Sequence, residues 1–339
     1  MPSVTDPEHQ RWLDQVHEAP IDPDLPICDP HHHLWDRDGS RYLLDELLAD
    51  LNCGHNIVST VFIECGAMYR ASGPEALRPV GETEFVNGLA AMSASGGYGP
   101  TRVCAGIVGF ADLMLGDAVD DVLEAHLAAS ARFRGIRHAA GWDASPEVRN
   151  SHTHPPQGLY ARDDFRRGFA RLASHGLSFE AWQYHHQLPE VIDLARAFPD
   201  TTIILNHFSG PLGIGPYTDR QGEVFTRWKT DIAELASCDN VVAKLGGLVM
   251  PINGFDFHKA AMPPDSATLA EATKDWYLHT IDSFGPDRCM FESNFPVDRA
   301  SVSYGVLYNS FKRITEGFLA AERAALFRGT AERIYRIED

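Results

Sequence analysis

A run of histidines near the start of the chain has the spacing of a metal or acid–base site. Residues 27–35 read I-C-D-P-H-H-H-L-W and include a short apolar segment. In an extended strand alternate side chains share a face, so Asp29, His31 and His33 point one way. His32 points the other way. Two histidines spaced i, i+2 at a strand end can both reach one divalent metal ion. The simpler alternative is a polar strand end with ordinary hydrogen-bonded histidines.

The later apolar segments also end in polar or aromatic residues, where a buried strand should be apolar. In chain order these residues are Glu64, Arg137, His138, Glu180, Trp182, Tyr184, Asn206, His207, Lys244, Glu292 and Asn294. Each of them alone is more often a satisfied polar residue at a strand end. If the strand ends converge, however, these side chains shift one another's pKa values, as an acid–base site requires.

Eight short apolar runs predict the strands that position these residues. They cover residues 25–28, 57–65, 102–110, 133–138, 177–184, 201–207, 241–245 and 288–291. Amphipathic segments such as 119–130, 163–175, 188–198 and 225–236 lie between them and predict helices. Strands that alternate with helices form parallel sheets, and eight such units favour a (β/α)₈ barrel. A doubly wound open sheet is the alternative.

The chain shows no linker or internal repeat, so we expect one barrel domain over residues 1–339. Residues 1–24 form an N-terminal extension, and residues 303–339 form closing helices. Three segments are longer than simple connections, namely 66–99, 139–162 and 246–267, after the second, fourth and seventh strands. In a barrel all three rise over the mouth, where they would form a lid or a pocket wall.

Charge and cysteine content restrict the partners and the compartment. The chain has 29 basic and 47 acidic residues and a formal charge of −18, which argues against nucleic acid or an anionic membrane surface as partner. No apolar run approaches the roughly 18 residues of a membrane span. Six single cysteines without a C-x-x-C pair, and an N-terminus without an apolar signal segment, favour the cytoplasm. We expect all six thiols to be free, and Cys28, Cys104 and Cys289 to be inaccessible.

Three motifs together resemble the amidohydrolase superfamily, specifically its amidohydrolase-related (type 2) branch. D-P-H-H-H-L-W at 29–35 resembles the D-x-H-x-H-x-W opening, and I-I-L-N-H-F-S-G-P at 203–211 is similar to V-L-D-H-x-G-x-P. R-C-M-F-E-S-N-F-P-V-D at 288–298 resembles R-x-M-F-G-S-D-W-P. The similarity in order and spacing runs from about residue 26 to residue 336. The branch contains sugar lactonases, pyrone-dicarboxylate lactonase and, more distantly, non-oxidative decarboxylases.

The resemblance implies a barrel enzyme that hydrolyses a cyclic ester or a related bond. It implies that His31, His33 and His207 surround the reacting carbonyl, with or without a metal. If one divalent ion is held, zinc is the first expectation, and Glu180 is the residue best placed to complete the ligand set. The alternative for Glu180 is an ion pair with Lys244. A metal-independent enzyme stays open, because some lactonases of the branch need none.

One position departs from the family pattern. The aspartate that takes a proton from the attacking water falls on Asn294, and an amide cannot act as a base at neutral pH. Asn294 is therefore expected to orient groups by hydrogen bonds. Asp298 is the favoured base and Glu292 the second candidate, with an N-terminal helix cap as the alternative for Asp298.

The expected pocket is aromatic and carries a cation. Arg137, Trp182, Tyr184, Lys244 and Glu292 are the candidate substrate-binding residues. Arg137 suits a substrate carboxylate, and its alternative is an ion pair inside the barrel. The leading hypothesis is a catabolic lactonase for a small carboxylated aromatic- or sugar-derived lactone. The alternatives are a metal-dependent decarboxylase or other C–C lyase of an aromatic acid, and a barrel that binds a small molecule without turnover. Assembly into a homo-oligomer stays open.

Overall fold

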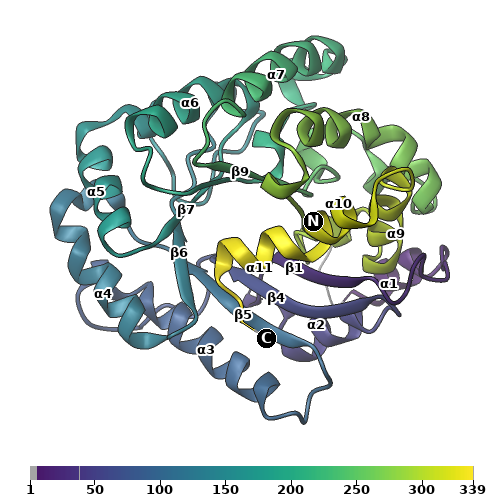
Figure 1. Ribbon diagram of the computed structural model, residues 1–339, viewed down its shortest axis with the longest axis horizontal. Helices are drawn as coiled ribbons and strands as arrows, with labels where there is room; N and C mark the ends of the chain where they lie inside the picture. Colours follow the sequence, from purple (N-terminus) through teal and green to yellow (C-terminus); the bar gives the residue numbers. More distant parts are fainter. Residues whose placement is uncertain (1–5, 38, 339) are drawn as a thin grey trace.

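A parallel sheet curled into a barrel forms the centre of the computed structural model, which describes residues 6–37 and 39–338 (Figure 1). In order around the sheet the strands are β1 (Pro26–His32), β4 (Asn56–Ile63), β5 (Arg102–Gly109), β6 (Phe133–Arg137), β7 (Ser178–Ala181), β8 (Ile203–Leu205), β9 (Val241–Leu245) and β10 (Cys289–Phe291). Beyond β10, Asn294 N donates to His31 O at 2.9 Å and His33 N donates to Phe295 O at 2.8 Å. These bonds bring the first and last strands together. The predicted (β/α)₈ barrel is thus confirmed, and the open sheet is excluded.

Helices surround the barrel, and Figure 1 shows α3 to α8 outside the strands. The helices are α1 (Pro7–Leu13), α2 (Leu44–Leu51), α3 (Val80–Ala94), α4 (Asp120–Ala129), α5 (Asp163–Ser174), α6 (Leu188–Ala197), α7 (Gln221–Leu235), α8 (Ser266–Phe284), α9 (Tyr304–Ile314), α10 (Ala320–Ala324) and α11 (Thr330–Tyr335). Each amphipathic segment buries one stripe against the strands. In α5, for example, Phe165, Phe169 and Leu172 recur at helical spacing and are fully buried. A small antiparallel hairpin, β2 (Trp35–Arg37) with β3 (Ser40–Tyr42), follows β1.

The interior of the barrel is apolar and is covered at its amino end by α11. Inward-facing residues from the strands are Cys28, Val61, Ile63, Ile204, Val242 and Met290. Ala331 and Tyr335 of α11 belong to the same cluster, and α11 lies across the strands near the centre of Figure 1. Arg134, at the start of β6, donates to Tyr335 O at 2.5 Å and so anchors this helix. The other end of the barrel is left for the polar residues.

Two further expectations bear on the environment of the chain. All six cysteines are free, and Cys28, Cys104 and Cys289 are fully buried, as predicted. Among the helices of residues 6–37 and 39–338, none is both long and apolar enough to cross a membrane.

Candidate active site

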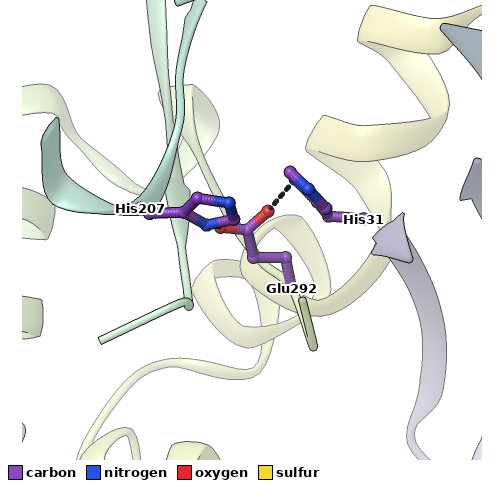
Figure 2. Close-up of side chains that lie close together, drawn as sticks. All are labelled: His31, His207 and Glu292. Carbon is purple, nitrogen blue, oxygen red and sulfur yellow. Dashed lines mark hydrogen bonds and ion pairs between the residues drawn. The ribbon is translucent and has the colours of Figure 1, made fainter. Parts of the chain in front are cut away.

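The candidate active site is a cluster of His31, His207 and Glu292 at the carboxyl ends of β1, β8 and β10 (Figure 2). Oε1 of Glu292 lies 2.6 Å from Nδ1 of His207, and Oε2 lies 2.8 Å from Nδ1 of His31. One ligand atom from each residue lies within 4.8 Å of the others. All three side chains are buried. The carboxylate therefore contacts both imidazoles.

Two consecutive glycines after β9 make room for this cluster. A β-carbon on Gly247 would lie 2.3 Å from Nδ1 of His207, and one on Gly246 would lie 2.2 Å from the backbone oxygen of Glu292. Gly247 also has a φ of +72°, which favours glycine. His207 has a φ of 50°, in the left-handed region that other residues rarely occupy. The site is therefore built at some cost in backbone strain.

Burial controls the protonation of the cluster. It lowers the pKa of His31 and of His207 well below the usual value, and the positive charges of Lys244 and Arg137 lower both further. Burial also raises the pKa of Glu292 to about 8, although Lys244 opposes the shift. At neutral pH both imidazoles are consequently neutral, and the carboxyl group holds a proton.

The donor set fits one divalent metal ion. Two neutral imidazoles and one carboxylate are a known set of three protein ligands for catalytic zinc. Oε2 of Glu292 is buried without a hydrogen bond to any residue in the described ranges, because its contact with His31 is not aligned for one. This oxygen is free to bind a cation. His31, His207 and Glu292 thus form a candidate metal site.

The third predicted histidine, His33, adjoins the cluster without joining the donor set. Its Nε2 lies 3.3 Å from Nε2 of His31, and its Nδ1 contacts Ile63 O at 2.8 Å. The rings of His31 and His207 are 4.4 Å apart between centroids. The expectation that His31, His33 and His207 lie within about 5 Å of one another holds for the two pairs that include His31, since the rings of His31 and His33 are 4.9 Å apart. His32 points away, as its parity predicts, and contacts Thr60 Oγ1 at 2.9 Å. The expectation that Asp29 shares the face of His31 is wrong, because the strand register shifts between Asp29 and His32. Asp29 instead accepts a hydrogen bond at 2.9 Å from the Tyr304 hydroxyl of α9.

Glu180 and Lys244 form a separate layer beneath the cluster. Nζ of Lys244 lies 2.9 Å from Oε2 of Glu180 and 3.3 Å from Nδ1 of His31. Glu180 also accepts hydrogen bonds from Asn206 Nδ2 and from the Tyr335 hydroxyl. Both charged side chains are fully buried, and neither lines a cavity at the mouth. Glu180 therefore forms the ion pair with Lys244 that was the alternative expectation, and it does not complete the ligand set. Glu292 lies beside the histidines instead.

Arg137 lines the mouth, but its guanidinium is engaged within the protein. Nε donates to Oε1 of Glu64 at 2.6 Å, and Nη2 donates to the backbone oxygen of Glu64 at 2.5 Å. Nη1 lies 3.4 Å from Nε2 of His31. The ion pair with Glu64 is the alternative that the sequence left open. Arg137 is thus a positive charge beside the cluster. Its Nε and Nη2, the two nitrogens that would pair with a substrate carboxylate, already donate to Glu64.

Asn294 and Asp298 form a pair at the barrel wall. Nδ2 of Asn294 donates to Oδ1 of Asp298 at 2.9 Å, and only Asn294 of the two lines the cavity. Burial raises the pKa of Asp298 well above its usual value. Ser303, rather than Asp298, is the N-cap of α9. Asp298 therefore lies behind Asn294 and away from the cavity. This position argues against Asp298 as the base, a role that stays a prediction.

A cavity of about 610 Å³ opens above the cluster. Its lining includes His33, Trp35, Arg37, Arg137, Arg149, His152, Trp182, Tyr184, His207 and Asn294. Trp182 and Tyr184 occupy the aromatic wall that the sequence predicted. The segment after β6 contributes residues 149–152 and the segment after β9 contributes Met250 and Ile252, whereas residues 66–99 contribute none. The role of these segments as a lid stays a prediction.

Sequence reasoning missed five basic residues of the lining, namely His9, Arg37, Arg149, His152 and Arg299. They lie on α1, on the hairpin strand β2, in the 139–162 segment or just after β10, where the parity of the barrel strands gives no signal. The only available indication was the length of the 139–162 segment, which holds Arg149 and His152. Loop residues of this kind are placed by tertiary contacts alone.

The barrel with a polar cluster at the carboxyl ends of its strands has the architecture of a (β/α)₈ enzyme. Comparison with known proteins agrees, because residues 28–337 match the amidohydrolase family. The chain is 33% identical over 336 residues to an uncharacterized protein, y4mH, of Sinorhizobium fredii, covering 93% of this chain and 99% of that protein. This protein belongs to the amidohydrolase family and is a hydrolase.

Two other relatives have a named activity or a solved structure. The chain is 28% identical to L-fucono-1,5-lactonase of Burkholderia multivorans, over 81% of this chain and 89% of that enzyme. A crystal structure of an amidohydrolase from Burkholderia multivorans with bound zinc has a TM-score of 0.71 and 26% identity, covering 92% of this chain and 99% of that one.

Proposed function

We propose that this protein is a lactonase, which opens a small cyclic ester by hydrolysis. One observation carries the proposal, namely the His31, His207 and Glu292 cluster bordering a cavity of about 610 Å³ in an amidohydrolase barrel. The naming of two Burkholderia relatives as L-fucono-1,5-lactonases supports the same reaction. The free thiols suit a reducing compartment, and we extend the proposal to a catabolic enzyme of the cytoplasm.

The cluster serves hydrolysis with or without an ion. A divalent metal held by His31, His207 and Glu292, with zinc as the first choice, would polarise the lactone carbonyl and acidify a water. Without a metal, the carboxyl group of Glu292 contacts Nδ1 of His207 at 2.6 Å and fixes the orientation of that ring. Because burial keeps His207 neutral, its ring can accept a proton from water. Both routes depend on Glu292.

The rest of the cavity favours a lactone that carries a carboxylate. Arg37 and Arg149 line it, and neither forms an ion pair with a residue in the described ranges. Arg37 stacks on Trp35, with 4.9 Å between the guanidinium carbon and the ring centroid. A carboxylated sugar- or aromatic-derived lactone would find both a cation and a flat apolar surface there.

A lactone panel read by proton release tests the proposal. The panel contains L-fucono-1,5-lactone, neutral δ-lactones and lactones bearing a carboxylate, each assayed with purified protein before and after chelation. We expect hydrolysis, and faster hydrolysis of the carboxylated members. Metal analysis of the same protein decides between the two routes.

The other two functions have their own outcomes. Release of CO₂ from aromatic acids without lactone hydrolysis would establish a decarboxylase, which Asn294 disfavours since an amide replaces the usual aspartate. Thermal stabilisation by lactones without turnover would establish a binding protein.

A further inference from the structure

His152 forms a second carboxylate–imidazole pair at the mouth, apart from the His207 and Glu292 pair. Its Nε2 lies 3.1 Å from Oε2 of Glu64. The His152 side chain is 39% exposed and lines the cavity, whereas Glu64 is fully buried. The pair thus joins a buried anion to an imidazole that substrate can reach.

Glu64 is held as an anion in this pair. Burial raises the pKa of its carboxyl group, but the positive charges of Arg137 and His152 outweigh burial and hold the pKa well below its usual value. Oε1 accepts from Arg137, which leaves Oε2 for His152. A carboxylate that accepts a hydrogen bond from one ring nitrogen fixes the orientation of the imidazole.

The backbone on both sides of His152 is anchored. Ser151 N donates to Gly141 O at 2.8 Å, and Thr153 Oγ1 donates to Ala139 O at 2.6 Å. Both acceptors lie just beyond the carboxyl end of β6, next to Arg137. His152 is therefore placed by fixed neighbours, even though it lies in a loop.

The other histidines that line the cavity are engaged differently. His33 uses Nδ1 toward Ile63 O and Nε2 toward His31, His207 contacts Glu292, and Nε2 of His9 contacts Arg299 O at 2.8 Å. No residue in the described ranges forms a hydrogen bond with Nδ1 of His152. This nitrogen is available to a ligand.

We propose that His152 is a further catalytic residue, the general acid that protonates the leaving ring oxygen, with Glu64 as its positioning residue. The inference rests on the proposed lactonase function. Water oxygen bonds to the acyl carbon, the ring C–O bond breaks, and its electron pair stays on the ring oxygen. That oxygen takes the proton from Nδ1 of His152, and His152 regains a proton from solvent. The proton lost by the attacking water goes to the base, which is His207 in the metal-free route.

Leaving-group dependence tests the assignment. An aliphatic lactone such as δ-valerolactone expels an alkoxide, which needs a proton, whereas dihydrocoumarin expels a phenoxide, which needs one far less. His152→Gln should lower kcat on δ-valerolactone by about 10²- to 10⁴-fold, the usual effect of losing general acid catalysis. On dihydrocoumarin kcat should fall by less than about fivefold, with KM little changed on both substrates. His154→Gln, an exposed histidine of the same loop, is the matched control and should retain both activities.

Two outcomes overturn the inference while leaving lactonase function intact. If His152→Gln loses the same factor on both lactones, His152 does not protonate the leaving group. If it loses nothing on either, His152 has no catalytic part. Melting temperatures of both variants check that the fold is retained. If the wild-type protein opens no lactone of the panel, the proposed function itself fails, which is a different and separately visible result.

Discussion

The carboxyl end of the barrel opens into the cavity, whereas α11 covers the amino end. At the carboxyl end the strands terminate in charged or hydrogen-bonding side chains, and Oε2 of Glu292 and Oδ2 of Asp298 are buried without a hydrogen-bond partner in the described ranges. His207 and Asn294 also adopt positive φ there. At the amino end Tyr335 packs among apolar residues such as Cys28 and Val61, all fully buried.

The carboxyl end thus gathers strain and unsatisfied polar groups around the cavity, whereas dense apolar packing dominates the amino end. Cys104, with a φ of 55°, and the buried Ser59 Oγ are exceptions in the first halves of β5 and β4. Unpaired buried polar atoms lower stability, so they are retained where they serve binding or chemistry. Apolar packing at the amino end supplies compensating stability. Changes at the carboxyl end should therefore alter activity more than stability, and changes at the amino end should do the reverse.

The largest effect is expected for Glu292→Gln. The amide mimics the protonated carboxyl group that burial favours, so the fold should persist. The amide can neither bind a metal as an anion nor exchange a proton with His207, and kcat/KM should fall by about 10²- to 10⁴-fold. Asp298→Asn is the matched comparison and should lose much less, because Asp298 does not line the cavity. The reverse order of losses, measured on the same lactone, would restore Asp298 as the base.

The next effect concerns zinc affinity and pH. Burial raises the pKa of Glu292 to about 8, so the residue holds a proton at neutral pH that must leave when a cation binds. The association constant for Zn²⁺ should therefore rise by about tenfold per pH unit between about pH 6 and about pH 8, and level off above. Calorimetric titration of chelator-treated protein measures it. A flat profile, or the same slope in Glu292→Gln, would remove Glu292 from the donor set.

A moderate effect on stability is expected for Tyr335→Phe at the amino end. The hydroxyl of Tyr335 donates to the buried Glu180, which would lose a hydrogen bond. The free energy of unfolding should fall by about 1–3 kcal/mol in urea titration. Since this end supports stability, kcat/KM should change by less than about twofold. A large loss of activity with unchanged stability would contradict the division between the ends.

The smallest effect is expected for thiol reactivity. Burial raises the pKa of Cys28 to about 12, and Cys104 and Cys289 are also fully buried. A thiol reagent should therefore modify few groups in native protein and all six after denaturation. Rapid native modification of Cys28 would show that the amino end opens readily.

The fold and part of the site could be predicted from the chain. Alternating strand and helix patterns indicated the barrel, and strand parity separated His31 and His33 from His32. The same parity placed Glu180, Lys244 and Glu292 inside the barrel. Strand parity did not tell whether Glu180 or Glu292 contacts the histidines. Both side chains point inward, and they differ only in their depth in the barrel and in their neighbours.

The sequence by itself determined the alternation of strands and helices, the inward direction of His31, Glu180, Lys244 and Glu292, and the types of group available at the mouth. These properties follow from periodicity and composition, which are local. Only the tertiary structure decided that Lys244 pairs with Glu180, that Glu292 contacts both histidines, and that Glu64 orients His152. Those pairings join residues far apart in the chain. They depend on strand stagger, on the space left by Gly246 and Gly247 and on the path of one loop, which no local pattern encodes.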